Sequence, residues 1–222
     1  MASALFITGT GTDVGKTLVT ALLAAFAQSQ GRSVCVYKPF QTGAASDADT
    51  DPATINRWLA QPVETRIGYR FAPPVAPFVA DDRHEIRLET VLERVAALRA
   101  RFDLTLVEGA GGVRVPLAPS LELIDVMAAL DLPTLVVARP DLGTINHTLL
   151  TLEALQTRKI PVRGVVVSRF EADSPDQAIA ALPRVWDAFL PVPVLAWIPS
   201  LDLTPGALTG EHPAVRAMAA CF

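Results

Sequence analysis

Hydrophobic residues follow two alternating patterns along this chain. Short apolar runs are typical of parallel strands covered on both faces, and between them lie longer segments whose apolar residues recur at helical spacing. The predicted strands are Leu5–Ile7, Ser33–Tyr37, Leu104–Glu108, Thr134–Ala138, Val162–Ser168 and Val194–Ile198. The predicted helices are Lys16–Gln30, a short helix opened by Asp51, 88–101, Leu121–Leu130, Thr144–Thr157 and Ser174–Leu190. This alternation predicts an α/β fold with a mostly parallel central sheet, helices on both faces and right-handed crossovers.

Single residues indicate where some of these helices begin and end. Gly31 is a natural C-terminal stop for the first helix, and Asp51 before Pro52 fits an N-cap followed by the first helical residue. Pro183 is expected to kink the helix in which it lies. The side of helix Thr144–Thr157 expected to face the core carries Ile145, Leu149 and Leu152.

Two segments lack such a pattern. Residues Pro62 to Arg83 are proline-rich and are predicted to form an irregular loop, long enough to suggest a functional role. The residues after Ile198 are poorly specified. No repeat or linker interrupts the chain, and half of its 222 residues are apolar. We therefore expect a single domain over residues 1–222.

A Gly-rich turn follows the first predicted strand and gives the strongest chemical signal. It reads Thr8-Gly9-Thr10-Gly11-Thr12-Asp13-Val14-Gly15-Lys16-Thr17 and leads into a helix. Backbone N–H groups and a helix N-terminus surround phosphates in such turns. Lys16 can then reach the β- and γ-phosphates, and the Thr17 hydroxyl can bind Mg²⁺. Gly9 lies one residue earlier than the strict pattern requires, so this is a variant phosphate loop with one extra residue.

Charged residues end two other predicted strands. Lys38 follows one strand, and Glu108 ends another before the run Gly109-Ala110-Gly111-Gly112. Ligands bind at the carboxyl ends of strands in such sheets, so both side chains are expected to face the ligand crevice; exposed strand ends are the alternative. Mg²⁺ prefers carboxylate, phosphate and water oxygens. Thr17, Glu108 and one further acid would therefore suffice to hold it.

The composition argues against several other classes of protein. A net charge of −4 does not suit a general nucleic-acid binder, and no apolar stretch reaches membrane-spanning length. The start of the sequence lacks the basic region and longer apolar core of a secretory signal. Cys35 and Cys221 fit reduced thiols, and the three histidines show no metal spacing. We therefore expect a cytoplasmic protein without a nucleic-acid or membrane partner.

Four segments in this order resemble one family, the dethiobiotin synthetases of biotin biosynthesis. They are the phosphate loop, Lys38-Pro39 with Thr42-Gly43, Val107-Glu108-Gly109-Ala110-Gly111-Gly112, and Leu142-Gly143-Thr144-Ile145-Asn146-His147. The family's phosphate loop carries the same extra residue, and the resemblance extends over most of the chain. It implies a P-loop NTPase-like fold and an ATP-dependent ligase that uses Mg²⁺ and works as a homodimer.

The resemblance also implies a reaction, which closes the ureido ring of dethiobiotin from 7,8-diaminononanoate, CO₂ and ATP. One amine traps CO₂ as a carbamate, the carbamate attacks the γ-phosphate, and the second amine displaces phosphate from the resulting carbamic–phosphoric anhydride. Two unit charges 4 Å apart repel by about 4 kcal/mol at an effective dielectric of 20. Lys16 and Lys38 would be catalytic because they offset this repulsion between two anionic reactants.

Matching motif by motif, the resemblance implies three sets of site residues. The metal ligands would be Thr17, Asp51 and Glu108. The nucleotide would be bound by Thr12, Asp13, Val14, Gly15, Lys16, Thr17, Asp51, Glu108, Ser168, Ile198 and Pro199. The diamine or its carbamate would be bound by Thr12, Lys38, Thr42, Gly111, Gly112, Gly143, Thr144 and Asn146. In the family, the segment matching Gly143 to His147 comes from the neighbouring subunit and receives the substrate's tail carboxylate, so the active site would span a dimer.

Two features leave questions open. Some family members carry Asn-Asp after the strand that ends here in Val165-Val166-Val167, and that Asn reads adenine, whereas this chain has Ser168-Arg169. The base preference is therefore open, and base discrimination is predicted to be looser. Asp47, Asp49 and Asp51 are all candidates for the second metal carboxylate. Asp51 is preferred because an Asp that opens a helix matches the family pattern best.

Two other functions compete with this one. A cobyrinate-type glutamine-dependent amidoligase shares the fold, but it needs a glutaminase domain with a nucleophilic cysteine, for which this chain is too short. A partitioning or septum-positioning ATPase switch carries a signature lysine at the position of Gly11. The absence of that lysine argues strongly against the switch.

Overall fold

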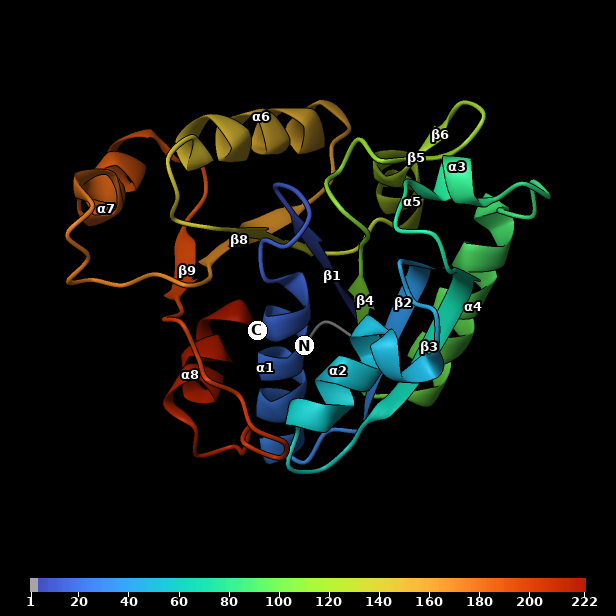
Figure 1. The fold of residues 1–222 in the computed structure, drawn as a ribbon, viewed down its shortest axis with the longest axis horizontal. Helices are drawn as coiled ribbons and strands as arrows, with labels where there is room; N and C mark the ends of the chain where they lie inside the picture. Colours follow the sequence, from blue (N-terminus) through green and yellow to red (C-terminus); the bar gives the residue numbers. More distant parts are fainter. Residues whose placement is uncertain (1–3) are drawn as a thin grey trace.

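The computed structural model describes residues 4–222 and contains a seven-stranded sheet of order β3-β2-β4-β1-β7-β8-β9 (Figure 1). Every neighbouring pair in this sheet is parallel. Its strands are β1 (Ala4–Gly9), β2 (Val34–Thr42), β3 (Glu64–Phe71), β4 (Leu104–Glu108), β7 (Thr134–Ala138), β8 (Val162–Val167) and β9 (Val194–Trp197). A separate antiparallel hairpin consists of β5 (Pro116–Ala118) and β6 (Leu121–Glu122). The predicted α/β class with a parallel central sheet is confirmed.

Helices cover both faces of the sheet. They are α1 (Lys16–Ser29), α2 (Asp51–Trp58), α3 (Pro77–Ala80), α4 (Leu88–Arg101), α5 (Leu123–Leu130), α6 (Thr144–Thr157), α7 (Gln177–Phe189) and α8 (Pro213–Arg216). Short 3₁₀ turns precede α2 (Asp47–Asp49) and follow α8 (Ala217–Cys221). None of the helices in this described part of the chain is long and apolar enough to cross a membrane.

Each face of the sheet has its own hydrophobic core. Residues of α1, α2 and α8 pack on one face, and residues of α4, α5, α6 and α7 pack on the other. Consecutive side chains of a strand point to opposite faces, so Phe6 and Ile7 of β1 enter different cores, and both are at most 1 % exposed. This explains why the central strands read as continuous apolar runs rather than alternating ones.

Strand β2 runs further than the sequence pattern predicted. It continues to Thr42 instead of ending at Tyr37, so Lys38 lies inside the strand. The last residue pair between β2 and β4 is Tyr37 with Val107. Pro39 therefore lies where β2 no longer needs an N–H group for β4, which is how a proline fits within a strand.

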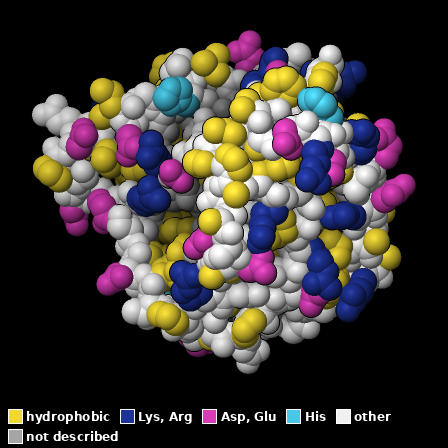
Figure 2. All heavy atoms as spheres, turned by 45° about the vertical axis from the view of Figure 1, so that its right-hand side comes forward, with side chains coloured by type: hydrophobic (Ala, Val, Ile, Leu, Met, Phe, Trp, Pro, Cys, Tyr) yellow, Lys and Arg dark blue, Asp and Glu magenta, His cyan; other side chains and the backbone are white. Residues whose placement is uncertain are grey.

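The prediction of an irregular loop from Pro62 to Arg83 is wrong. Residues Glu64–Phe71 form β3, the edge strand beside β2, and Pro77–Ala80 form α3. The strand is half exposed and carries charged residues, as edge strands often do. Arg66 and Arg70 form ion pairs with Glu64 and Asp47. On the face shown in Figure 2, basic and acidic side chains are interspersed. The flanking prolines concealed a strand whose aromatic and aliphatic residues alternate with polar ones.

Three helix predictions need correction at their ends or faces. Thr50 caps α2 by accepting a hydrogen bond from the Ala53 N–H, so Asp51 is the first helical residue and not the cap. Helix α7 begins at Gln177 after the cap Asp176, three residues later than predicted, and contains Pro183 as expected. Leu121–Glu122 belong to β6, and α5 starts at Leu123.

The buried side of α6 also differs from the prediction. Its predicted bounds, Thr144–Thr157, are confirmed. Of the three residues expected to face the core, only Leu152 is buried, whereas Ile145 and Leu149 are half-buried. The buried side is instead formed largely by threonines, namely Thr144, Thr148 and Thr151, together with Leu155.

Candidate active site

The carboxyl ends of β1, β2 and β4 meet around one pocket. It is lined by residues of the phosphate loop, of β2, of α2, of the loop after β4, and by Arg169 after β8. The full lining is Thr12, Asp13, Gly15, Lys16, Thr17, Leu18, Lys38, Phe40, Gln41, Thr42, Asp51, Trp58, Ala110, Gly111 and Arg169. The pocket thus lies where ligands bind in parallel α/β sheets.

The phosphate loop is supported by Ser168, the residue that follows β8. Gly15, the residue before α1, has a φ of 97°, a backbone conformation that favours glycine. A Cβ at this position would lie 2.6 Å from the Ser168 hydroxyl oxygen. That hydroxyl donates a hydrogen bond to the Val14 carbonyl (2.6 Å). Glycine at position 15 thus allows β8 to support the loop at close range.

The side chain of Lys16 reaches back to the phosphate loop. Its ammonium donates to the Gly11 carbonyl at 2.7 Å, and the residue is only 6 % exposed. Burial, together with the nearby Lys38, lowers the pKa of Lys16 from 10.5 to about 8. The ammonium is therefore costly to keep charged in this site until an anion joins it.

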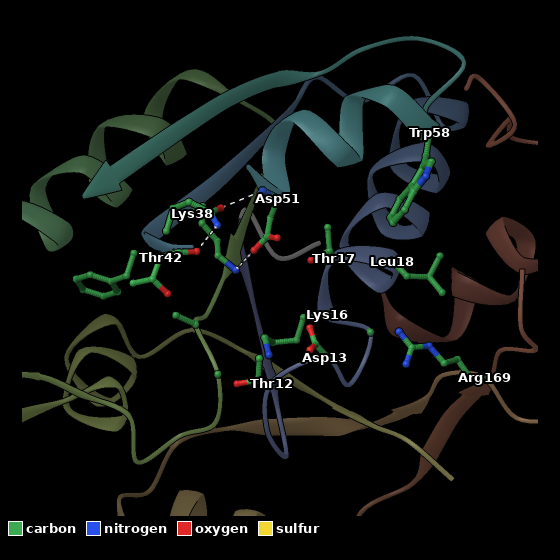
Figure 3. A pocket seen from close by; sticks show the side chains of 15 residues that line it. Thr12, Asp13, Lys16, Thr17, Leu18, Lys38, Thr42, Asp51, Trp58 and Arg169 are labelled. Atoms are coloured by element: carbon green, nitrogen blue, oxygen red, sulfur yellow. Dashed lines mark hydrogen bonds and ion pairs between the residues drawn. The ribbon is translucent and has the colours of Figure 1, made fainter. Parts of the chain in front are cut away.

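Lys38 lies between two carboxylates. Its Nζ is 2.5 Å from Asp51 Oδ2 (Figure 3). It is also 2.8 Å from Glu108 Oε1, and it donates a hydrogen bond to the Gly109 carbonyl. Burial alone would lower the pKa of Lys38, but the charges of Glu108 and Asp51 outweigh it and raise that pKa. Lys38 is therefore a fixed cation beside the phosphate loop. The whole sequence contains three lysines, and two of them line this pocket.

Thr17 and Glu108 supply oxygen atoms that suit Mg²⁺. The Thr17 hydroxyl donates to Glu108 Oε1 at 3.0 Å, while Glu108 Oε2 is buried without a hydrogen-bond partner among the described residues. Such an orphaned carboxylate oxygen next to a hydroxyl and a phosphate loop is an incomplete oxygen ligand set, which a divalent cation completes. The residues present therefore fit the metal.

The structure separates the three acidic candidates for the second carboxylate. Asp51 lines the pocket, and its backbone N–H donates to the side chain of Gln41. Asp47 is fully exposed and pairs with Arg70, and Asp49 accepts hydrogen bonds from Ser46. Because Thr50 provides the helix cap, the carboxylate of Asp51 is free to face Lys38.

The predicted substrate residues fall into two places. Thr12, Thr42 and Gly111 line the same pocket as Lys38. Thr144, together with Arg139 and His147, lines a neighbouring hollow beside the phosphate loop, and Gly112 lines an apolar groove along α6. Gly143 and Asn146 are exposed at the start of α6. Within one copy of the chain, the start of α6 is therefore not part of the pocket that holds the lysines.

Two of the three predicted base-side residues are fully buried. Ser168 and Ile198 are each 0 % exposed, and the only exposed residue of the three, Pro199, lines a different hollow with Phe170 and Trp197. Their role in nucleotide binding stays a prediction.

The predicted site did not include Leu18, Trp58 and Arg169, which line the other side of the pocket from Lys38 and Thr42 (Figure 3). Leu18 and Trp58 read as ordinary apolar positions of amphipathic helices, and both do pack partly against a core. Arg169 lies two residues after the end of β8, and proximity to the carboxyl end of a strand is the signal that identified Lys38 and Glu108.

Comparisons with known protein sequences match most of this chain. A family model described as an AAA domain matches residues 3–206. An ATP-dependent dethiobiotin synthetase BioD of Bacillus subtilis (strain 168) is 36% identical over 201 residues, which cover 88% of this chain and 87% of that relative. A BioD of Mycolicibacterium vanbaalenii is 45% identical over 174 residues, covering 77% and 76%.

Solved structures with a similar fold are more distant. The septum site-determining protein MinD of Pyrococcus horikoshii OT3, complexed with Mg-ADP, matches with a TM-score of 0.63 at 19% identity and covers 99% of this chain and 94% of its own. The MinC:MinD complex of Aquifex aeolicus matches with a TM-score of 0.64 at 20% identity, covering 98% and 93%. These matches show a shared fold, whereas the much higher identity to the BioD sequences decides between the families.

Proposed function

This chain belongs to the ATP-dependent dethiobiotin synthetase family, and we propose that its pocket closes the ureido ring of dethiobiotin from 7,8-diaminononanoate, CO₂ and ATP. The observation that carries the proposal is the placement of two buried lysines, Lys16 and Lys38, on one pocket with the hydroxyl of Thr17. Such a pocket suits the meeting of two anions, a triphosphate and a carbamate.

The phosphate loop binds the triphosphate. Backbone N–H groups from Asp13 to Thr17 surround the phosphates at the start of α1, and Lys16 exchanges its bond to the Gly11 carbonyl for phosphate oxygens. This exchange favours the charged form of Lys16, because an anion then offsets the burial that lowers its pKa to about 8.

The diamine and its carbamate bind at Lys38, Thr12 and Thr42. An amine nitrogen attacks CO₂, loses a proton and becomes a carbamate. A carbamate oxygen then bonds to the γ-phosphorus while ADP leaves. The second amine attacks the carbonyl carbon of the anhydride, and phosphate leaves as the ring closes. Lys38 stabilises the negative charge on the transferring oxygens, and its own position is fixed by Asp51 and Glu108.

Thr17, Asp51 and Glu108 would hold Mg²⁺. The unpartnered Glu108 Oε2 and the adjacent Thr17 hydroxyl are the features of this chain that support the assignment. When bound, the ion neutralises charge on the phosphates.

We further propose that a partner copy supplies the start of α6. Gly143, Thr144 and Asn146 lie outside the lysine pocket of their own chain. The N-terminus of α6 exposes backbone N–H groups that suit the tail carboxylate of the diamine. A homodimer would bring this helix end to the pocket of the other copy.

Phosphate release tests the proposed reaction. The full chain is given ATP, Mg²⁺ and bicarbonate, with and without 7,8-diaminononanoate. Release is expected with the diamine and is expected to be absent without it. Equal release in both reactions would contradict the proposal and favour an ATPase switch, so the omission of the diamine is the decisive control.

A further inference from the structure

One side of the nucleotide pocket, formed by Leu18, Trp58 and Arg169, has no role in the reaction described above. We infer that Arg169 reads the base of the nucleotide and favours bases that present a carbonyl oxygen. The inference rests on the proposed function, since it assumes that the triphosphate lies along the phosphate loop.

The layout of the pocket places the base at this end. Lys38 and Thr42 lie on one side of the phosphate loop, and Leu18, Trp58 and Arg169 lie on the other (Figure 3). The start of α1, where the phosphates bind, lies between the two. A nucleotide whose γ-phosphate points toward Lys38 must therefore extend its base toward Leu18, Trp58 and Arg169.

The backbone holds Arg169 in place from both sides. On one side, Ser168 donates its N–H to the Ala138 carbonyl and its hydroxyl to the Val14 carbonyl. On the other side, Phe170 donates its N–H to the Ile198 carbonyl, and its ring lies 4.4 Å from that of Trp197. Arg169 itself has a φ of 58°, a left-handed conformation that few residues other than glycine adopt. Such an outlier, fixed by its neighbours, is typical of functional positions.

The guanidinium of Arg169 is available to a ligand. Within residues 4–222, nothing forms a hydrogen bond or ion pair with it, and the residue is exposed. The nearby carboxylate of Glu171 accepts a hydrogen bond from the Ser200 N–H instead. The structure thus holds the backbone of Arg169 firmly and leaves its donors unused.

Arginine chemistry then determines which bases fit. The guanidinium offers five N–H donors and no acceptor. Guanine presents two acceptors side by side, O6 and N7, and cytosine presents O2 and N3, whereas adenine places its amino donor beside its ring acceptors N1 and N7. Leu18 and Trp58 offer apolar and aromatic surfaces that suit any base. Arg169 therefore supplies the discrimination, and its loss should weaken binding of guanine and cytosine nucleotides more than that of adenine nucleotides.

Direct binding of nucleoside diphosphates tests this inference without the diamine. The dissociation constants of Mg-ADP, Mg-GDP and Mg-CDP are measured by calorimetry on the full chain and on its Arg169→Ala, Arg169→Gly and Arg169→Lys variants. Glycine at position 169 also relieves the left-handed backbone, so that variant is expected to fold even if alanine is not tolerated. The matched control is Arg184→Ala, at an exposed arginine of α7 outside the pocket.

The expected result is a change in the ratio of affinities. In the Ala and Gly variants, the preference for GDP and CDP relative to ADP should fall about tenfold, the size expected for one bidentate base contact. The Lys variant should lose the same preference, because lysine keeps the charge but not the planar fork. Ratios that match the unchanged chain in the Ala and Gly variants, or that survive in the Lys variant, would overturn the inference.

This experiment separates two failures. Binding of all three nucleotides with ratios that ignore Arg169 would remove the base-reading role and leave the proposed reaction intact. A failure of the unchanged chain to bind any of them would instead contradict the proposed function, and with it the inference.

Discussion

The two sides of the nucleotide pocket are built in opposite ways. On the first side, Lys38, Asp51 and Glu108 are buried or half-buried and satisfy one another through ion pairs. On the second side, Leu18 and Trp58 offer apolar surface, and Arg169 has no hydrogen bond or ion pair from its side chain among residues 4–222. The first side is a preorganised set of charges, which suits chemistry on phosphate. The second side offers apolar surface and hydrogen-bond donors to a ligand, which suits selection among ligands.

The comparison also explains why the two sides differ in how easily they are read from sequence. On the charged side, Lys38 and Glu108 lie in motifs near the carboxyl ends of β2 and β4, and Lys16 lies in the phosphate loop motif, so all three were predicted from the sequence. The other side combines a residue of α1, a residue of α2 and a strand end. Trp58 and Leu18 look like core residues until the structure shows that their helices also border the pocket.

Removing a lysine from the charged side should have the largest effect. Lys16→Ala and Lys38→Met should each lower turnover by at least ~10²-fold, as expected for loss of one group that stabilises developing charge. Lys159, the third lysine of the chain, lies outside the pocket, so Lys159→Met is the matched control and should retain turnover. Steady-state rates of phosphate release measure all three variants.

Loss of Lys38 should affect turnover but not nucleotide binding. Lys38→Met should still bind ADP, because the base and the phosphate loop are contacted by other residues. Thermal unfolding of each variant shows whether a loss of rate reflects a loss of folding. Near-normal turnover in a folded Lys38→Met protein would remove Lys38 from the chemistry.

The pH dependence of ADP affinity should show a smaller effect. Lys16 loses its proton as the pH rises through about 8 in the free protein. Phosphate groups complete their ionisation near pH ~6, so only the lysine charge changes above neutral pH. ADP affinity should therefore fall up to about tenfold per pH unit above pH ~8. An affinity that stays level from neutral pH to pH ~9.5 would show that Lys16 does not govern binding in this way, and Lys16→Met should lack the fall.

The stability of the protein should change least, and in the opposite direction to activity. The pKa of Lys16 is about 8 in the folded protein and 10.5 in the unfolded chain. The unfolded state therefore binds more protons between these values, and folding stability rises with pH across that window. Below it, the buried ammonium costs about 3 kcal/mol, partly offset by its hydrogen bond to Gly11.

Lys16→Met should consequently raise the free energy of unfolding by roughly 1–3 kcal/mol at neutral pH. Urea unfolding at neutral pH and at pH ~9.5 measures the difference, which should shrink at the higher pH. A variant that is less stable than the unchanged chain at neutral pH would contradict the assigned cost of the buried charge.

Much of the fold follows from local patterns, and the exceptions have physical causes. Helix 88–101 and strand Leu104–Glu108 lie where the periodicity places them. Strand β3 was not predicted because this edge strand is half exposed, carries charges and lies between prolines. The sequence did not show which threonines of α6 are buried, since threonine occurs both in cores and on surfaces.

The site shows a similar limit. Motifs locate the phosphate loop, Lys38 and Glu108, and of the three acids only Asp51 lines the pocket, where it pairs with Lys38. Thr50 provides the helix cap, which leaves the Asp51 carboxylate facing Lys38. The family resemblance already favoured Asp51, whereas the run of small and acidic residues by itself left Asp47, Asp49 and Asp51 as equal candidates, because the distinction depends on the three-dimensional path of one turn.

Incorporation of labelled carbon tests the central claim most directly. The full chain is incubated with ¹³C-bicarbonate, 7,8-diaminononanoate, ATP and Mg²⁺, and the product is analysed by mass spectrometry beside a phosphate assay. The account predicts a cyclic urea that carries one ¹³C atom for each phosphate released, formed at least ~10²-fold more slowly with Lys38→Met. Phosphate release without any labelled product would contradict the account.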